Sequence, residues 1–310
     1  MPDRRVLAEC VINVSEGRDP AVISALGAAG AETMLDVHTD REHNRTVLTL
    51  GGPLETVEDA SHRIVAAAVD LIDLRAHTGV HPRRGAADVV PFVPLGANGG
   101  VGHLSPPDAW APVVEARDRF AGWAGRDLGL PCFLYGPERS LPEVRRSAFR
   151  SLQPDTGPRV PHPTAGASAV GARPVLVAYN VWLAEAPDVE RSGGPSVLTV
   201  ARTLAGRLRS PAVRSLGLAV EAGAQVSFNL IDPSSTSVAE LYDTVAAEAE
   251  SGGFSVLRAE LVGLIPALAL RGIPRHRWDE LDLDEARTIE ARLATRGYPV
   301  AEDRAGPGRR

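Results

Sequence analysis

The chain has 310 residues, a formal net charge of −6 and no lysine among its 33 basic residues. A chain of this length has room for two domains, and its acidic balance argues against a general nucleic-acid binder, for which a basic face is expected. No apolar run approaches the roughly 20 residues that cross a bilayer. We therefore expect no signal peptide, no membrane anchor and a cytoplasmic location. Cys10 and Cys132 lie in apolar strand-like runs, where reduced thiols are expected.

Residues 6–95 alternate strand and helix patterns. A long helix is predicted at 53–74, because proline and acidic residues begin it and its apolar residues recur at helical spacing. A shorter helix is predicted from the Asp-Pro pair at 19–20. Strand-like segments flank these helices at 8–14, 31–37, 43–52 and 88–95.

The middle of the chain is predicted to hold a helix at 105–129, a strand at 131–136 and then a loop rich in glycine and proline at 152–173. A loop of this length is usually functional or a linker. The second half begins with a nearly continuous apolar strand, 174–184, of the kind found at the centre of a sheet. Further elements follow as a helix at 195–209, strands at 213–220 and 224–231, a helix at 237–253 and a strand at 254–266.

Both halves therefore show the order β-α-β-β-α-β. This order is typical of ferredoxin-like, split-βαβ folds. We predict an α/β (α+β) protein of two domains, residues 1–172 and 173–302, each a mixed β-sheet layered with helices in ferredoxin-like βαββαβ order. Residues 303–310 are rich in arginine, glycine and proline and are predicted to form a disordered tail.

A polar turn follows the long helix in the stretch HTGVHPRRGAADVVPF, residues 77–92. His77, His81 and Asp88 could supply three metal ligands, but Gly79 breaks the helix that would align the histidines. The alternative is that one histidine acts as a general acid or base near neutral pH. The density of flanking polar groups favours this second interpretation over a purely structural turn.

Two further segments carry polar or flexible residues. The stretch DVHTDREHNRTV, residues 36–47, is either an ordinary charged hairpin or a group that meets the 77–92 turn at one end of the sheet. In the second case Asp36, His38, Asp40, Asn44 and Arg45 would lie near His81. The loop DTGPRVPHPTAGASAVGAR, residues 155–173, is either a linker or a binding loop at the domain junction, where glycines allow a flat ligand to approach the backbone.

Several blocks carry a resemblance to a known family. They are ECVINVSEGRD, LIDLRAHTGVHPRRGAADVVPFVPL, HPTAGASAVGAR, AQVSFNLID and AELVGLIP, in order from about residue 8 to about residue 270. The chain resembles the glutamate formimidoyltransferases and the transferase part of the formimidoyltransferase-cyclodeaminases. The resemblance implies a homodimeric two-domain α/β enzyme of histidine degradation. Such an enzyme moves a formimidoyl group from N-formimidoyl-L-glutamate to N5 of tetrahydrofolate, a co-substrate, and requires no metal.

The resemblance also implies roles for particular residues. His81 would be the catalytic general acid/base, and Asp36, His38 and Asp40 would lie near the reacting carbon. Because both substrates are carboxylates, Arg45, Arg83 and Arg173 are expected to bind them, with Asn44 beside Arg45. The folate-contacting loop would comprise Gly157, Pro158, Arg159, Val160, Pro161, His162, Pro163, Thr164, Ala165 and Gly166.

Three positions depart from the family pattern. Arg84 stands where the family usually has methionine, Thr156 where it has phenylalanine and Trp182 where it has a small amide. These departures leave open an alternative function, a folate-dependent formimidoyltransferase that acts on a different amine in a specialised, antibiotic-type pathway. An inactive folate-binding protein and a metal-dependent hydrolase of formimidoylglutamate are the other possibilities. In either transferase, a histidine that both removes and returns a proton is the central requirement.

Overall fold

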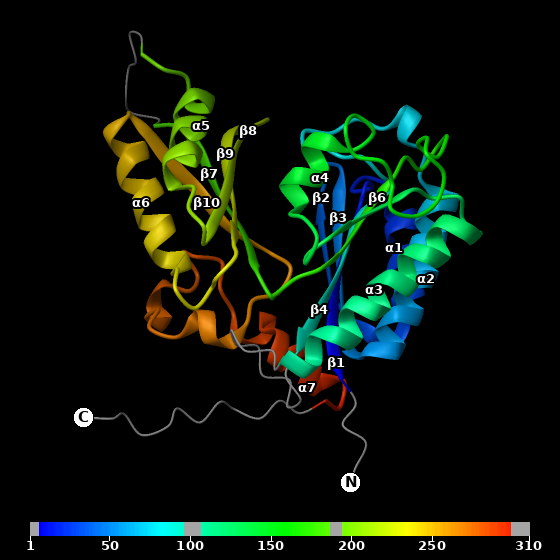
Figure 1. Cartoon of the computed structure of the whole chain (residues 1–310). Coiled ribbons are helices and arrows are strands. Elements are labelled where there is room, and N and C mark those ends of the chain that lie inside the picture. Colours follow the sequence, from blue (N-terminus) through cyan, green and yellow to red (C-terminus); the bar gives the residue numbers. More distant parts are fainter. Residues whose placement is uncertain (1–5, 96–106, 187–193, 299–310) are drawn as a thin grey trace.

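The computed structural model describes residues 6–95, 107–186 and 194–298, which form two β-sheets with helices. Figure 1 shows α1, α2 and α3 on the outer side of one sheet and α5 and α6 on the outer side of the other. The opposite faces of the two sheets are therefore turned towards each other, and α4 (Leu141–Ser147) packs on that face of the first sheet. We call β1 to β6 with their helices the first domain, and β7 to β10 with α5 and α6 the second domain.

The first domain contains the predicted β-α-β-β-α-β order over residues 6–95. Its remaining elements extend the sheet to the strand order β2-β3-β1-β4-β6-β5, in which β6 runs parallel to both of its neighbours. The bounds are β1 (Leu7–Val14), α1 (Pro20–Gly30), β2 (Met34–Asp40), β3 (Arg45–Pro53), α2 (Leu54–Leu71), β4 (Ala87–Leu95), α3 (Pro107–Asp127), β5 (Cys132–Tyr135), α4 (Leu141–Ser147) and β6 (Ser168–Ala172).

The prediction of an uninterrupted loop at 152–173 was wrong at its end, because β6 lies there. Its sequence, SAVGA, is made mostly of small residues with little intrinsic preference for strands. The strand forms because it fits between β4 and β5, where all five of its residues are buried. The first sheet is thus mixed, as predicted, but larger than a four-stranded ferredoxin-like sheet.

The core of the first domain explains which side chains point towards the second domain. Cys10, Ile12 and Val14 of β1 are fully buried against the helices. Because successive residues of a strand point to opposite faces, Glu9 and Asn13 lie on the other face of the sheet. Burial raises the pKa of the Cys10 thiol to about 12, so this cysteine is an unreactive core residue, as the sequence predicted.

The second domain has the strand order β10-β7-β9-β8, and every pair in it is antiparallel. A mixed sheet was predicted, but each helix connects two strands that are not neighbours, so no parallel pair forms. The bounds are β7 (Val177–Glu185), α5 (Val197–Leu208), β8 (Val213–Val220), β9 (Gly223–Leu230), α6 (Val238–Ser251) and β10 (Phe254–Val262).

Contacts at both ends of the sheets join the domains. After β10 the chain passes through three short 3-10 segments, Ala267–Leu270, Arg275–Arg277 and Glu285–Arg287, to α7 (Ile289–Thr295). Ile289 and Leu293 of α7 pack against Leu35 and Leu95 of the first domain. At the opposite end, the backbone N–H of Glu221 in the β8–β9 turn donates to Glu42 Oε2 in the β2–β3 turn, 3.0 Å away.

Three further sequence expectations concern a membrane span, the C-terminal tail and the domain boundary. None of the helices within 6–95, 107–186 and 194–298 is long and apolar enough to cross a membrane. The tail predicted at 303–310 lies outside the described residues. The predicted boundary at 172/173 falls in the connection between the end of β6 and the start of β7.

Candidate active site

The polar turn at 77–86 lies directly against the β2–β3 hairpin. A Cβ atom at Gly79 would lie 2.4 Å from the carbonyl oxygen of His43, so glycine permits this close approach. Asn44, at a positive φ of 47°, donates from Nδ2 to the carbonyl oxygen of Thr78 over 2.9 Å and accepts from the backbone N–H of Gly17 over 2.8 Å. The hairpin and the turn therefore form one braced unit.

Arg83 adds to this bracing. Its Nη2 donates to the carbonyl oxygens of His43 and His81 over 2.9 and 2.7 Å. Its Nη1 contacts the ring of His77. Asn44 and Arg83 were predicted to bind substrate, and that role stays a prediction. Their described contacts hold the histidine turn in place.

His81 lies against two partners. Its Nδ1 is 2.8 Å from the carbonyl oxygen of Pro82, and Arg45 Nη1 lies 2.6 Å from Nδ1 and 2.8 Å from Nε2 of the same ring. Since a guanidinium only donates, a neutral ring accepts from Arg45 only through the nitrogen that carries no proton. The structure thus brings together the two predicted residues His81 and Arg45.

The surroundings keep His81 neutral. Burial lowers the pKa of His81 well below its ordinary value, and the positive charges of Arg45 and Arg145 lower it further. Burial also lowers the pKa of Arg45 to about 10, which still leaves its guanidinium charged at neutral pH. A neutral imidazole beside a partly buried cation is suited to act as a base.

Asn13 and His43 belong to this cluster, although sequence reasoning missed both. Asn13 Oδ1 accepts from Arg45 Nη2 over 2.7 Å and from Nε over 3.2 Å, which fixes the guanidinium. The ring centroid of His43 lies 5.9 Å from that of His81, and the backbone N–H of His43 donates to Asp40 over 2.8 Å. Asn13 could have been found because it is a polar residue on the face of β1 that points away from the helices.

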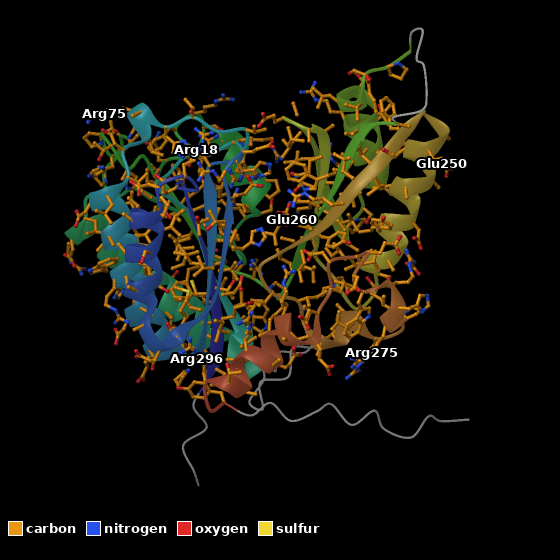
Figure 2. The ribbon with its side chains drawn as sticks, turned by 180° about the vertical axis from the view of Figure 1, so that it is seen from behind. Arg18, Arg75, Glu250, Glu260, Arg275 and Arg296 are labelled. Carbon is orange, nitrogen blue, oxygen red and sulfur yellow. The ribbon has the colours of Figure 1, made fainter. Side chains whose placement is uncertain are left out.

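His38 points across to the second domain. Its Nε2 lies 3.4 Å from Glu260 Oε1 on β10. In Figure 2 Glu260 lies between the two sheets, on the side of the second sheet that faces the first domain. Glu260 lies within the block AELVGLIP that carried part of the family resemblance, but its position opposite His38 was not predicted.

Asp36 and Arg173 lie in other surroundings. Asp36 Oδ1 is 3.8 Å from Arg292 Nη2 on α7. Arg173 donates to the carbonyl oxygen of Pro174 over 2.8 Å, and its charge lowers the pKa of Glu9. The described contacts of these two residues are thus made near α7 and the N-terminal half of β1, and do not include the His81 turn. Their predicted roles stay predictions.

The predicted folate loop is bonded to the segment that flanks His81. The carbonyl oxygens of Thr164 and Ala165 accept from the backbone N–H groups of Leu74 and Ala86, both over 2.9 Å. Within the loop, His162 and Gly166 exchange two backbone hydrogen bonds of 2.7 and 3.0 Å. The second half of the loop is therefore fixed beside the 77–86 turn, while Val160 is exposed.

The metal-binding alternative finds no ligand cluster in the described part of the chain. Within 6–95, 107–186 and 194–298, no three or more His, Cys, Asp or Glu side chains are grouped to hold a metal ion. His77 and His81 each contact a different arginine, Arg83 and Arg45.

Taken together, the fold and the site define a two-domain α/β enzyme with a neutral histidine and an arginine in contact. Family models agree with this class. The formiminotransferase domain, N-terminal subdomain, matches residues 7–173, and the formiminotransferase domain matches residues 178–293. The chain belongs to the formiminotransferase family, as its sequence motifs predicted, and is a transferase.

Curated relatives are similar over most of the chain. The glutamate formimidoyltransferase of Streptococcus pyogenes serotype M1 is 34% identical to this chain over 309 residues. The alignment covers 91% of this chain and 97% of that protein. This chain is 33% identical over 308 residues to the Thermoplasma acidophilum enzyme of the same name, with 93% and 97% covered. The formimidoyltransferase-cyclodeaminase of Sus scrofa is 33% identical over 293 residues, 85% of this chain and 51% of that protein.

Proposed function

We propose that this chain transfers the formimidoyl group of N-formimidoyl-L-glutamate to N5 of tetrahydrofolate, giving 5-formimidoyltetrahydrofolate and L-glutamate. The names of the two full-length relatives support the donor. The observation that carries the mechanism is the contact between Arg45 and His81, an imidazole that its surroundings keep neutral. No structural observation favours a different amine in a specialised pathway.

The reaction requires one proton to be removed and one to be supplied. N5 of the folate attacks the formimidoyl carbon, and the new C–N bond forms as the unprotonated ring nitrogen of His81 takes the proton that N5 loses. His81 then gives this proton to the glutamate nitrogen as the bond between that nitrogen and the carbon breaks. General acid–base catalysis of this kind contributes about 10²–10⁴-fold in rate.

Arg45 couples substrate binding to this proton transfer. In the structure its Nη1 contacts the His81 ring, and its positive charge adds to the effect of burial in lowering the pKa of that ring. A substrate carboxylate that draws the guanidinium into a charge-assisted pair removes this contact. The unprotonated nitrogen of His81 is then free to accept the proton of N5, so the base becomes available when substrate is bound.

The loop from Gly157 to Gly166 is proposed to hold the folate. Its bonds to Leu74 and Ala86 place it on both sides of the catalytic turn, and its exposed first half is free to contact a ligand. Holding both substrates beside His81 makes a bimolecular step effectively unimolecular. As in the family resemblance, we further propose a cytoplasmic homodimer that takes part in histidine degradation.

The test is the absorbance of 5,10-methenyltetrahydrofolate after acid treatment of a reaction that contains tetrahydrofolate and N-formimidoyl-L-glutamate. We expect product from the wild type and a loss of about 10²–10⁴-fold in His81→Ala. His276→Ala, which changes an exposed histidine of the second half of the chain, is the matched control and should retain full activity. A folded wild type that binds folate but forms no product would overturn the proposed donor.

A further inference from the structure

Glu260 is anchored by two neighbours on the same face of the second sheet. One carboxylate oxygen, Oε2, accepts from Asn180 Nδ2 and from Trp182 Nε1, both over 3.0 Å. Asn180 is the direct cross-strand partner of Glu260 between β7 and β10. Trp182, at a position where the family usually has a small amide, supplies its indole N–H instead. These two donors fix Oε2, and the other oxygen, Oε1, faces His38 of the first domain.

This carboxylate is both buried and charged. Glu260 is 7% exposed, and burial alone would raise its pKa, but hydrogen bonds from His38, Asn180 and Trp182 bring the pKa down to about 2. The guanidinium of Arg258 lies over the ring of Trp182, at 4.1 Å, and its Nη1 stays 3.9 Å from Oε1, beyond hydrogen-bond distance. A buried, charged carboxylate of this kind is stabilised when a cation binds directly to the oxygen that accepts fewer hydrogen bonds, here Oε1.

The location of Oε1 relates it to the histidine cluster. His38 lies two residues before Asp40 on the same face of β2, and Asp40 is the cross-strand partner of Arg45. Arg45 contacts His81. Burial lowers the pKa of His43, whose ring lies 5.9 Å from that of His81, and the negative charge of Glu260 is among the groups that oppose this shift. The charge of Glu260 therefore acts on the first domain at the place where proton transfer is proposed.

The other carboxylates described near the cluster have their partners in the first domain or on α7. Asp40 accepts from the backbone N–H of His43, and its second oxygen lies 3.9 Å from the His43 ring. Asp88 accepts from Arg145 over 2.8 Å and from the backbone N–H of Arg84 over 2.7 Å. Asp36 lies beside Arg292. Glu260 is the carboxylate that turns an oxygen from the second domain towards the first.

We infer that Glu260 binds the positively charged formimidoyl group of the donor, and that the site is therefore completed across both domains. This inference rests on the proposed function. An amidine is a strong base, so the formimidoyl group is a planar cation at neutral pH, and its N–H donors suit a carboxylate. Glu260 then orients the electrophilic carbon, while His81 serves the nitrogen that attacks it. The second domain supplies the negative charge and the first domain supplies the base.

Binding of two ligands that differ in charge tests this inference. N-formyl-L-glutamate replaces the cationic nitrogen of N-formimidoyl-L-glutamate with a neutral oxygen and keeps the rest of the molecule. Calorimetry on the wild type should show tighter binding of the cationic ligand. In Glu260→Gln we expect its Kd to rise about 10- to 100-fold, the value of a charge-assisted hydrogen bond, while the Kd of the neutral ligand changes less than about threefold. Glu250→Gln, an exposed position of α6, is the matched control (Figure 2).

The outcomes separate this inference from the proposed function. If Glu260→Gln weakens both ligands equally, Glu260 serves to hold the domains together through His38, and the inference is overturned. An unchanged Kd for the cationic ligand overturns it as well, as does a wild type that binds both ligands alike. A wild type that prefers the cationic ligand but forms no product with tetrahydrofolate would refute the transfer reaction and leave the Glu260 assignment supported.

Discussion

The two sheets contain the same β-α-β-β-α-β order, yet the faces that they turn towards each other carry different chemistry. The first face holds the basic group of Arg45, His81 and His38, fixed by Asn13. The second face contributes the carboxylate of Glu260 and the donors that keep it charged. A shared topology therefore leaves open which charge each face carries, and local side-chain donors decide it.

Two buried glutamates show most directly that side-chain donors decide the charge of a buried group. Glu9 on β1 is 3% exposed and Glu260 on β10 is 7% exposed. Burial raises the pKa of Glu9 to about 7, although Arg173 opposes the shift. The pKa of Glu260 falls to about 2 because three side chains donate to it. Similar burial thus leaves Glu9 partly protonated at neutral pH and Glu260 fully charged, depending on the donors aimed at each carboxyl group.

The largest effect in this comparison is expected on stability, from Glu9→Gln. Because the folded-state pKa of Glu9 lies above its unfolded value, the folded state binds more protons between about pH 4.5 and 7, and stability falls as pH rises through that window. The variant lacks this loss and should be more stable than the wild type at pH 8, by about 3 kcal/mol. Urea unfolding of both proteins at pH 5 and pH 8 measures this difference in the free energy of unfolding. Equal pH dependence of the two proteins would show that Glu9 is already ionised in the folded state.

Arg45→Met should remove the cation of the first face. The loss of a charge-assisted contact to substrate is expected to lower kcat/KM about 10- to 100-fold. The pKa of His81 should also rise part of the way towards its ordinary value, since burial still acts on it but the neighbouring charge is gone. The pH profile of kcat/KM reports both effects. Arg214→Met, at an exposed position of β8, is the control, and an unchanged acid limb would contradict the coupling between Arg45 and His81.

Trp182→Phe should weaken the second face without removing its carboxylate. The ring is kept, but Glu260 loses the donor Nε1, and its pKa should rise from about 2. We expect kcat/KM to fall about three- to tenfold, as for a single hydrogen bond to a charged group. A double-mutant cycle with Glu260→Gln provides the check. Additive losses in the double variant would mean that Trp182 acts independently of Glu260.

Much of the fold could be predicted from local patterns. The long helix α2 buries Val57, Ile64 and Ala68, the residues whose spacing indicated it. The short elements α4, β6 and α7 were missed. Each is seven residues or fewer and depends on distant partners, such as the strands on either side of β6 or the first-domain residues beneath α7. Local propensity is weak for segments that tertiary contacts create.

The site was predictable to a similar degree. One of the two interpretations of the polar segments 36–47 and 77–92 placed Arg45, with four other residues, near His81, and the structure shows the contact between Arg45 and His81. Glu260 lies within a strand motif, and nothing local places a residue of β10 opposite β2. That relation arises from the way two separate sheets face each other, which sequence spacing does not encode.

The final helix, α7, belongs by its contacts to the first domain, although it follows the second domain in the chain. Although α7 follows the second sheet in the chain, it packs on Leu35 and Leu95, and Arg296 just beyond it donates to the carbonyl oxygen of Met34 over 2.6 Å. A chimaera made by joining this first domain to the second half of a relative at residue 173 would exchange α7 as well. Successful domain shuffling in this family therefore requires that the last helix be chosen to match the first domain, independently of the sheet that precedes it.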